Sequence, residues 1–246
     1  MHIFISGASG RNGRIVLQEA LDKGHTVTVL VRNPDSLTPH PNLTILKGKK
    51  ERNTPLPSSI FYILSPVSWN PLLPIRRRKG TLITHPPLRH PHDPQPPPHE
   101  RKPLCAPGPG LSPDLLESTT KTLLSAIRGT PFAEPPKIVV NSLFGAGSSW
   151  PNMSFPLRFV MHHSTMKLTI KDHNKVDALV RESGLPFVLA RPARLTEGAV
   201  TKVKVWPDDG AGCGWNPSIS RDSLGKWMVH AAESNEWDGK SPVLAE

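Results

Sequence analysis

The sequence of 246 residues predicts an α/β fold: a doubly wound parallel sheet that is interrupted by a Pro-rich irregular segment. Two observations predict this fold. Short runs of apolar and β-branched residues alternate with segments of helical periodicity near both ends of the chain. A glycine-rich turn also joins the first apolar run to the first helical segment, as in folds that bind nucleotides at the end of a strand.

The N-terminal elements form a predicted βαβ unit followed by a third strand. Residues 2–6 and 26–31 are apolar or β-branched and predict two buried strands. Between them, residues 14–23 place apolar side chains on one helical face, and Gly24 is a typical residue just after a helix. Residues 43–46 predict the third strand.

Regular patterning returns near residue 112. Ser112 and Pro113 resemble an N-cap followed by the first helical residue, and the helical spacing of apolar residues then continues to Gly129. The later elements are a predicted strand at 137–141, a helix at 172–183 and a strand at 187–191 that Pro192 ends.

The composition of the middle of the chain differs from that of its flanks. Residues 49–113 contain 16 of the 29 prolines and carry +7 of the formal charge of +10. In this stretch only residues 60–64 suggest a strand, and the rest cannot bury enough apolar surface to offset its conformational entropy. We predict one domain over 1–246, with 49–111 as an aberrant insertion. Our hypothesis is that the insertion is translated intron or out-of-frame sequence, and a natural disordered insertion is the alternative.

The glycine-rich turn predicts a dinucleotide site of the Rossmann type. It spans residues 7–13, follows a strand and opens a helix, so its backbone would approach a pyrophosphate at the positive end of that helix. A turn that is merely rich in glycine is the alternative. The residues predicted to bind the cofactor are Gly7, Ser9, Gly10, Arg11, Asn12, Gly13, Arg32 and Pro192.

The end of the second strand favours NADP(H) over NAD(H). An NAD site usually has a carboxylate there, which accepts a hydrogen bond from the ribose hydroxyl. This chain has Arg32, and a guanidinium pairs with a 2′-phosphate through two hydrogen bonds. Arg32 as a solvated loop residue is the alternative.

Three segments resemble the atypical short-chain dehydrogenase/reductase superfamily, nearest to its NAD(P)H-binding, NmrA-like and biliverdin-reductase-B-like group. These segments are the glycine-rich turn, residues 182–192 and residues 219–224. Residues 172–174, Asp-His-Asn, resemble fungal averufin-oxidase-type oxidoreductases. The resemblance implies an NADP(H)-dependent oxidoreductase that acts on a small aromatic or polyketide-type substrate in secondary metabolism. A non-catalytic NmrA-like protein that senses NAD(P) is the alternative.

The candidate catalytic residues are His173, Ser142 and Thr169. The superfamily often has a Tyr-x-x-x-Lys pair, but its positions fall here on Thr169 and His173, and the sole tyrosine is Tyr62. His173 has a titration range suited to proton exchange, or it serves a structural role at a helix start. Ser142 follows the strand at 137–141, where the family's active-site serine lies, and would orient a substrate oxygen.

Other classes of protein and site fit the sequence less well. Cys105 and Cys213 offer no metal-ligand spacing, and the pair His162–His163 has no further ligand near it, so we expect no metal. The basic segment is not interleaved with aromatic residues, so we expect no nucleic acid partner. The sequence has no run of 18 apolar residues and no basic leader, so we expect a cytoplasmic protein without a membrane partner.

A small-molecule substrate is the expected partner. Residues 208–212 lie between Trp206 and Trp215 and are either a loop over the substrate cleft or a simple hairpin turn.

Overall fold

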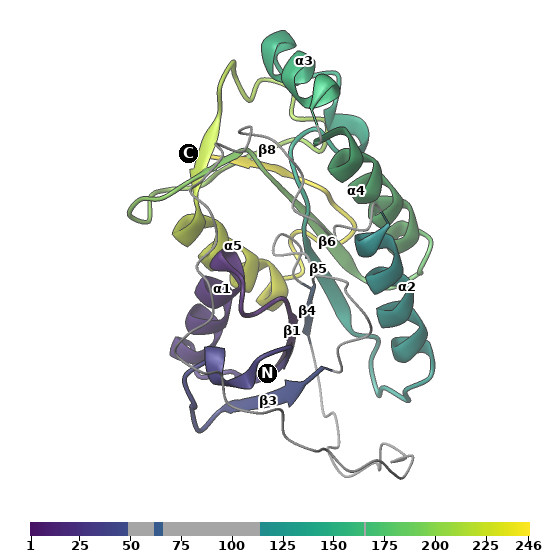
Figure 1. The fold of residues 1–246 in the computed structure, drawn as a ribbon, viewed down its shortest axis with the longest axis vertical. Helices are drawn as coiled ribbons and strands as arrows, with labels where there is room; N and C mark the ends of the chain where they lie inside the picture. Colours follow the sequence, from purple (N-terminus) through teal and green to yellow (C-terminus); the bar gives the residue numbers. More distant parts are fainter. Residues whose placement is uncertain (49–61, 66–113, 165) are drawn as a thin grey trace, which may run out of the picture.

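The computed structural model describes residues 1–48, 62–65, 114–164 and 166–246, and it confirms the predicted α/β class (Figure 1). In the described part, eight strands form one sheet in the order β3-β2-β1-β4-β5-β6-β10-β8, and β7 pairs with β9. The strands of the large sheet are β1 (His2–Ser6), β2 (Thr26–Val31), β3 (Leu43–Lys47), β4 (Tyr62–Ser65), β5 (Lys137–Asn141), β6 (Phe187–Pro192), β8 (Lys204–Trp206) and β10 (Val243–Ala245). The small sheet has β7 (Arg194–Thr196) and β9 (Ser218–Ser220).

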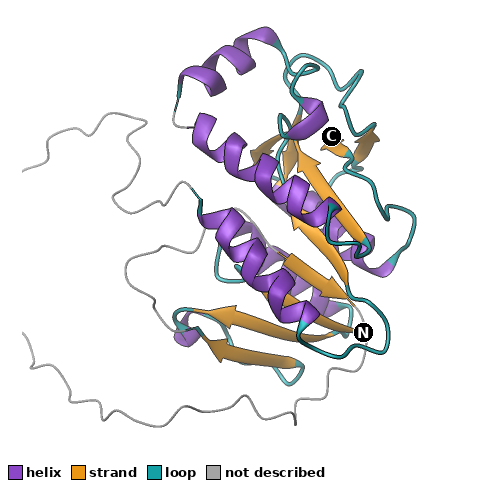
Figure 2. Ribbon diagram, turned by 90° about the vertical axis from the view of Figure 1, so that its right-hand side faces the viewer, coloured by secondary structure: helices purple, strands orange, loops and turns teal. Residues whose placement is uncertain are grey.

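Helices cover both faces of the large sheet, as doubly wound folds require. The helices are α1 (Arg11–Asp22), α2 (Leu115–Arg128), α3 (Phe155–His163), α4 (Met166–Arg181) and α5 (Arg221–Glu233). One apolar core lies between the sheet and the pair α1 and α5, and a second lies under α2 and α4 (Figures 1 and 2). Among the side chains that the structure describes, the strand residues of the second core come from β5 and β6.

The helices α1 and α5 pack closely because a glycine faces the crossing. A Cβ at Gly225 in α5 would lie 2.5 Å from Cγ2 of Ile15 in α1. Any larger side chain there would push the two helices apart.

The direction of β4 corrects the prediction that the sheet is parallel throughout. Neighbouring strands pair in parallel on each side of β4, but β4 runs antiparallel to both β1 and β5. Tyr62, its first residue, pairs with Ser6 and Val140, so the chain enters β4 at the carboxyl edge of its neighbours. Apolar patterning predicted the strand but carries no information about its direction.

The strand β8 also differs from an all-parallel sheet, since it runs antiparallel to β10 at the sheet's end. The rest of the predicted insertion, residues 49–61 and 66–111, lies outside the described residues, so our hypothesis about its origin stays a prediction.

Two predicted helix starts are wrong, and one side chain explains both. The helix α4 begins at Met166 instead of Asp172, and the N-cap of α2 is Asp114 instead of Ser112. The Asp172 carboxylate accepts hydrogen bonds from the N–H groups of Leu116 (2.9 Å) and Glu117 (3.0 Å). Asp172 is therefore a capping residue, as its residue type suggests, but it caps the neighbouring helix.

A buried ion pair links α4 to the end of β6. The Arg191 guanidinium, which is 1% exposed, donates to Asp177 over 2.7 Å. Asp177 also accepts a hydrogen bond of 2.6 Å from Arg181 in the next turn of α4. Gly147 lies against the guanidinium with φ +56°, so a side chain at this position would overlap Arg191 and strain the backbone.

The same guanidinium holds the loop after β8. Arg191 donates to the carbonyl of Asp208 over 2.5 Å and to the Ser148 hydroxyl over 2.8 Å. Asn152 donates to the carbonyl of Asp209 over 3.0 Å. These bonds join the segment predicted as either a substrate loop or a hairpin turn to the loop after β5, so it is tied to the body of the sheet.

Replacing Asp177 with Ala should lower the free energy of unfolding by about 3–5 kcal/mol, because it leaves the Arg191 charge buried without its carboxylate. Urea unfolding of the purified protein measures this loss. The matched control is Glu197→Ala, which removes an exposed carboxylate from Arg221 and should cost less than about 1 kcal/mol. Equal losses in the two variants would contradict the importance of the buried pair.

Candidate cofactor site

The predicted glycine-rich turn lies between β1 and α1 with its backbone exposed for an anion. Gly7 has φ +84°, which a glycine adopts without strain, and its carbonyl accepts the N–H of Gly10 at 3.0 Å. Gly10 is the N-cap of α1, where no side chain caps the helix and no acidic residue lies in the first turn. The first N–H groups of α1 and the positive end of its dipole therefore remain available.

In two other helices, side chains of the protein already bind the first backbone N–H groups. The first N–H groups of α2 bind the Asp172 carboxylate. In α5 the Ser220 hydroxyl accepts the N–H of Ser223 at 3.1 Å, and Asp222 lies in the first turn. A phosphate is therefore better accommodated at α1 than at either of these helices.

Basic side chains surround the start of α1. Arg14 donates from Nε to the carbonyl of Ser9 over 3.2 Å, which fixes its side chain beside the turn. Arg11 is exposed and lies 3.9 Å from a carboxylate oxygen of Glu197. Arg32 follows the last residue of β2 and is exposed to solvent. Asn12, by contrast, is buried.

The strands β5 and β6 bring Ser142 and Pro192 to the same edge of the sheet as Gly7. The N–H of Ser142 donates to the carbonyl of Ala190 over 2.7 Å, and the N–H of Phe144 donates to that of Pro192 over 2.9 Å. Pairing between these strands thus continues past the end of β5. Ligands of doubly wound sheets bind at this carboxyl edge.

The surroundings of His173 differ from those that we expected. It lies inside α4 instead of at a helix start, and it is buried. Burial lowers the pKa of its imidazole to about 4, so the ring is neutral at pH 7. Burial thus moves the pKa of His173 away from neutral pH, and its predicted role in proton exchange stays a prediction.

Among the described residues, Nδ1 of His173 has no hydrogen-bond partner. Thr169 is half-buried one helical turn before His173. The structure therefore brings Ser142 and Pro192 to the edge that carries Gly7 and places Thr169 and His173 together in α4.

The family model for NAD(P)H-binding proteins matches residues 7–58 and 106–235 of this sequence. The chain belongs to the NAD(P)H-binding family. The first matched segment contains the whole glycine-rich turn and Arg32, and the second contains Ser142, His173 and Pro192. No curated protein sequence matches the chain.

Solved structures of similar fold cover nearly the whole chain at low sequence identity. A putative NAD-dependent epimerase/dehydratase from Bacillus halodurans is 17% identical, with a TM-score of 0.57, over 100% of this chain and 94% of its own. A short-chain dehydrogenase/reductase from Veillonella parvula, solved with NADP, is 14% identical, with a TM-score of 0.59 over 100% and 94%. ChuY, an anaerobillin reductase from Escherichia coli O157:H7, is 13% identical, with a TM-score of 0.58 over 98% and 95%. At these identities the likeness shows a shared fold.

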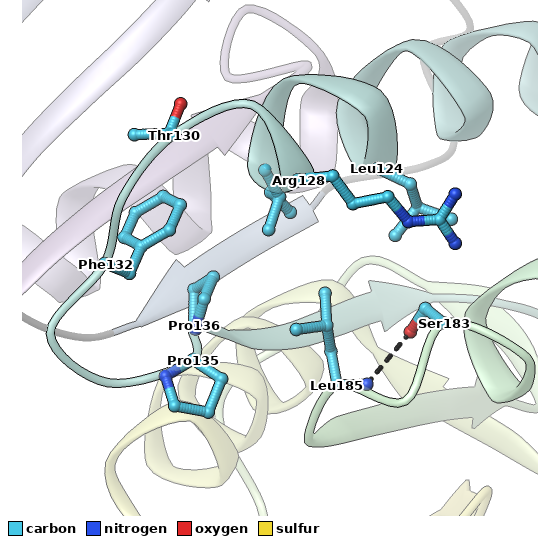
Figure 3. Close-up of a pocket in the computed structure, with 9 residues that line it drawn as sticks. Leu124, Arg128, Thr130, Phe132, Pro135, Pro136, Ser183 and Leu185 are labelled. Carbon is cyan, nitrogen blue, oxygen red and sulfur yellow. Dashed lines mark hydrogen bonds between the residues drawn. The ribbon is translucent and has the colours of Figure 1, made fainter.

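A hollow at the opposite edge of the sheet is separate from this site. It has a volume of about 240 Å³ and lies between the end of α2 and the turns that precede β5 and β6, where Leu124, Phe132 and Leu185 line it (Figure 3). Its position at the amino edge separates it from the glycine-rich turn.

In the described ranges, no group of three or more His, Cys, Asp or Glu side chains could hold a metal. None of the helices there has the length and apolar character needed to cross a bilayer.

Sequence reasoning missed the roles of Asp172, Asp177 and Arg191. Arg191 itself could have indicated the ion pair, because it is a charged residue at the end of an apolar strand and a buried charge requires a partner. The identity of that partner depends on how α4 packs, which the local sequence does not encode.

Burial of His173 should make stability depend on pH. The unfolded chain binds a proton near the ordinary pKa of 6.5, whereas the folded pKa is about 4, so the unfolded state binds more protons between these values. The free energy of unfolding should therefore fall by up to about 3 kcal/mol as the pH falls from 6.5 to 4. Urea unfolding across this range should show a smaller fall for His173→Gln. His162→Gln, at an exposed site, should retain the wild-type profile, and identical profiles for all three proteins would contradict this account.

Proposed function

We propose that the protein is an NADP(H)-dependent oxidoreductase that acts on a small aromatic or polyketide-type substrate. The observation that carries the proposal is the uncapped start of α1 behind the Gly7 turn, with Arg32 at the end of the neighbouring strand. The first feature suits a pyrophosphate and the second suits a 2′-phosphate. The resemblance of residues 172–174 to averufin-oxidase-type oxidoreductases supports the substrate class.

The residues at the carboxyl edge suit hydride transfer to or from a carbonyl carbon. A bound nicotinamide would supply or accept the hydride. Ser142, at the end of β5, would donate a hydrogen bond from its hydroxyl to the substrate oxygen, and Pro192 would contact the cofactor from the end of β6. Because His173 is buried and Thr169 half-buried in α4, we propose that both support this helix near the site, that the Ser142 hydroxyl orients the substrate oxygen, and that solvent supplies or takes up the proton.

A second function, sensing of the dinucleotide without turnover, is favoured by the burial of His173. This residue and Thr169 occupy the positions of the Tyr-x-x-x-Lys pair, and neither supplies a proton donor that titrates near neutral pH. An NmrA-like sensor needs only the cofactor half of the site.

Replacing Arg32 with Asp should weaken NADPH binding by about tenfold or more, because the guanidinium is lost and a carboxylate repels the 2′-phosphate. NADH, which lacks this phosphate, should bind no more weakly than to the wild type. Fluorescence titration with both cofactors measures the two affinities. Arg128→Asp makes the same charge change at the amino edge and should leave both unchanged. A parallel loss of both cofactors in the Arg32 variant would contradict the NADP(H) assignment.

Turnover separates the enzyme from the sensor. We expect NADPH oxidation with members of a panel of quinones and hydroxyanthraquinones, and we expect Ser142→Ala to lower kcat by about 10²-fold with NADPH affinity unchanged. The control Ser183→Ala removes a hydroxyl that accepts the N–H of Leu185 far from the site, and it should keep the wild-type kcat. NADPH binding without turnover of any panel member would favour the sensor.

A further inference from the structure

The helix α3 exposes large apolar side chains on the side that faces away from the protein. Phe155 is 72% exposed, Phe159 54% and Val160 57%, and the rings of the two phenylalanines lie 6.5 Å apart. At the start of α4, Met166 is 43% exposed and Leu168 49%. We call these five residues the α3 surface.

The residues of the α3 surface are not part of the apolar core, which other residues of α3 contact. Met161 is buried, and Leu157 packs against the same core cluster, which also contains Phe144 and Met153. At 100° per residue, Phe159 lies about 200° from Met161 around the helix, so the exposed rings lie on the opposite side. A helix with apolar residues on both sides has more apolar surface than its own fold buries.

The charged residues in the segment that carries the α3 surface have one sign. Residues 155–171 include Arg158, Lys167 and Lys171 and contain no Asp or Glu. Lys167 and Lys171 are exposed. Two copies of the chain that met through this surface would bring these cations together, so the charge pattern disfavours self-association and favours an anionic partner.

We propose that the α3 surface docks the protein on a bilayer that contains anionic lipid. The helix α3 lies at one end of the molecule (Figure 1), and Phe155 and Phe159 are its most exposed aromatic side chains. Exposed aromatic side chains of a surface helix insert at the boundary between headgroups and acyl chains, while neighbouring lysines bind the headgroups. This binding is peripheral and adds to the proposed function without depending on it.

The position of α3 adds a link to the candidate site. After the carboxyl end of β5 the chain passes Ser142 and then residues 143–154 before it enters α3 at Phe155. A protein docked through α3 would therefore hold this edge of its sheet near the bilayer.

Flotation of the full chain with lipid vesicles tests the proposal. The protein should float with vesicles of phosphatidylcholine that contain about one third phosphatidylserine, and at least about tenfold less with phosphatidylcholine alone. High salt should weaken the binding. The double variant Phe155→Ser/Phe159→Ser should bind the anionic vesicles at least about tenfold more weakly, and Lys167→Glu/Lys171→Glu should also lose binding.

Matched controls separate docking from loss of structure. Val200→Ser changes an exposed apolar residue in a different loop and should bind vesicles like the wild type. NADPH binding and thermal unfolding of the Phe155→Ser/Phe159→Ser variant should also stay unchanged, since both side chains are exposed. Failure of the wild type to bind anionic vesicles would overturn the proposal. Wild-type dimers in sedimentation that become monomers in the double variant would also overturn it, since the surface would then be an interface between copies.

Discussion

The buried ion pair between Arg191 and Asp177 organises the carboxyl edge of this sheet. One guanidinium reaches a helix, the turn that contains Ser148 and the loop at Asp208, and no part of it is exposed enough for water to replace these partners. Removing two charges from water is costly, and such a group persists where several hydrogen bonds fix its geometry. Three segments far apart in the sequence are thereby set at fixed positions beside the ends of β5 and β6.

The N-termini of α1, α2 and α5 differ in what binds their first N–H groups. The N-terminus of α2 is capped by the Asp172 carboxylate, and that of α5 by the hydroxyl of its own Ser220. The N-terminus of α1 has neither kind of partner. Side chains of the protein therefore satisfy the N-termini of α2 and α5, whereas the N-terminus of α1, behind the glycine-rich turn, is available to a ligand, which agrees with membership of the NAD(P)H-binding family.

Local patterning predicted the first strands and helix of the chain and α2, β5 and β6, because β-branched runs and glycine stops carry their own conformational preferences. It did not predict α3, α5 or the short strands β7 to β10. The strand at 137–141 has the predicted bounds, and the turn at residues 7–13 has the predicted context. Three features depended on distant residues and were not predictable: the direction of β4, the partner of Arg191 and the burial of His173. Asp172 illustrates the difference, since its residue type indicated a cap but only tertiary packing identifies which helix it caps.

The antiparallel strand β4 has a consequence for how the two halves of the molecule unfold. It is four residues long and is the only strand, among those described, that connects the β1 side of the sheet to the β5 side. The helix α5 packs against α1 and also against β5 and β6, so it joins both sides through apolar contact. Cooperativity between the halves then depends on α5 as well as on the backbone ladder. Amide protons in the middle of α5 would consequently exchange with solvent in openings that separate the two halves.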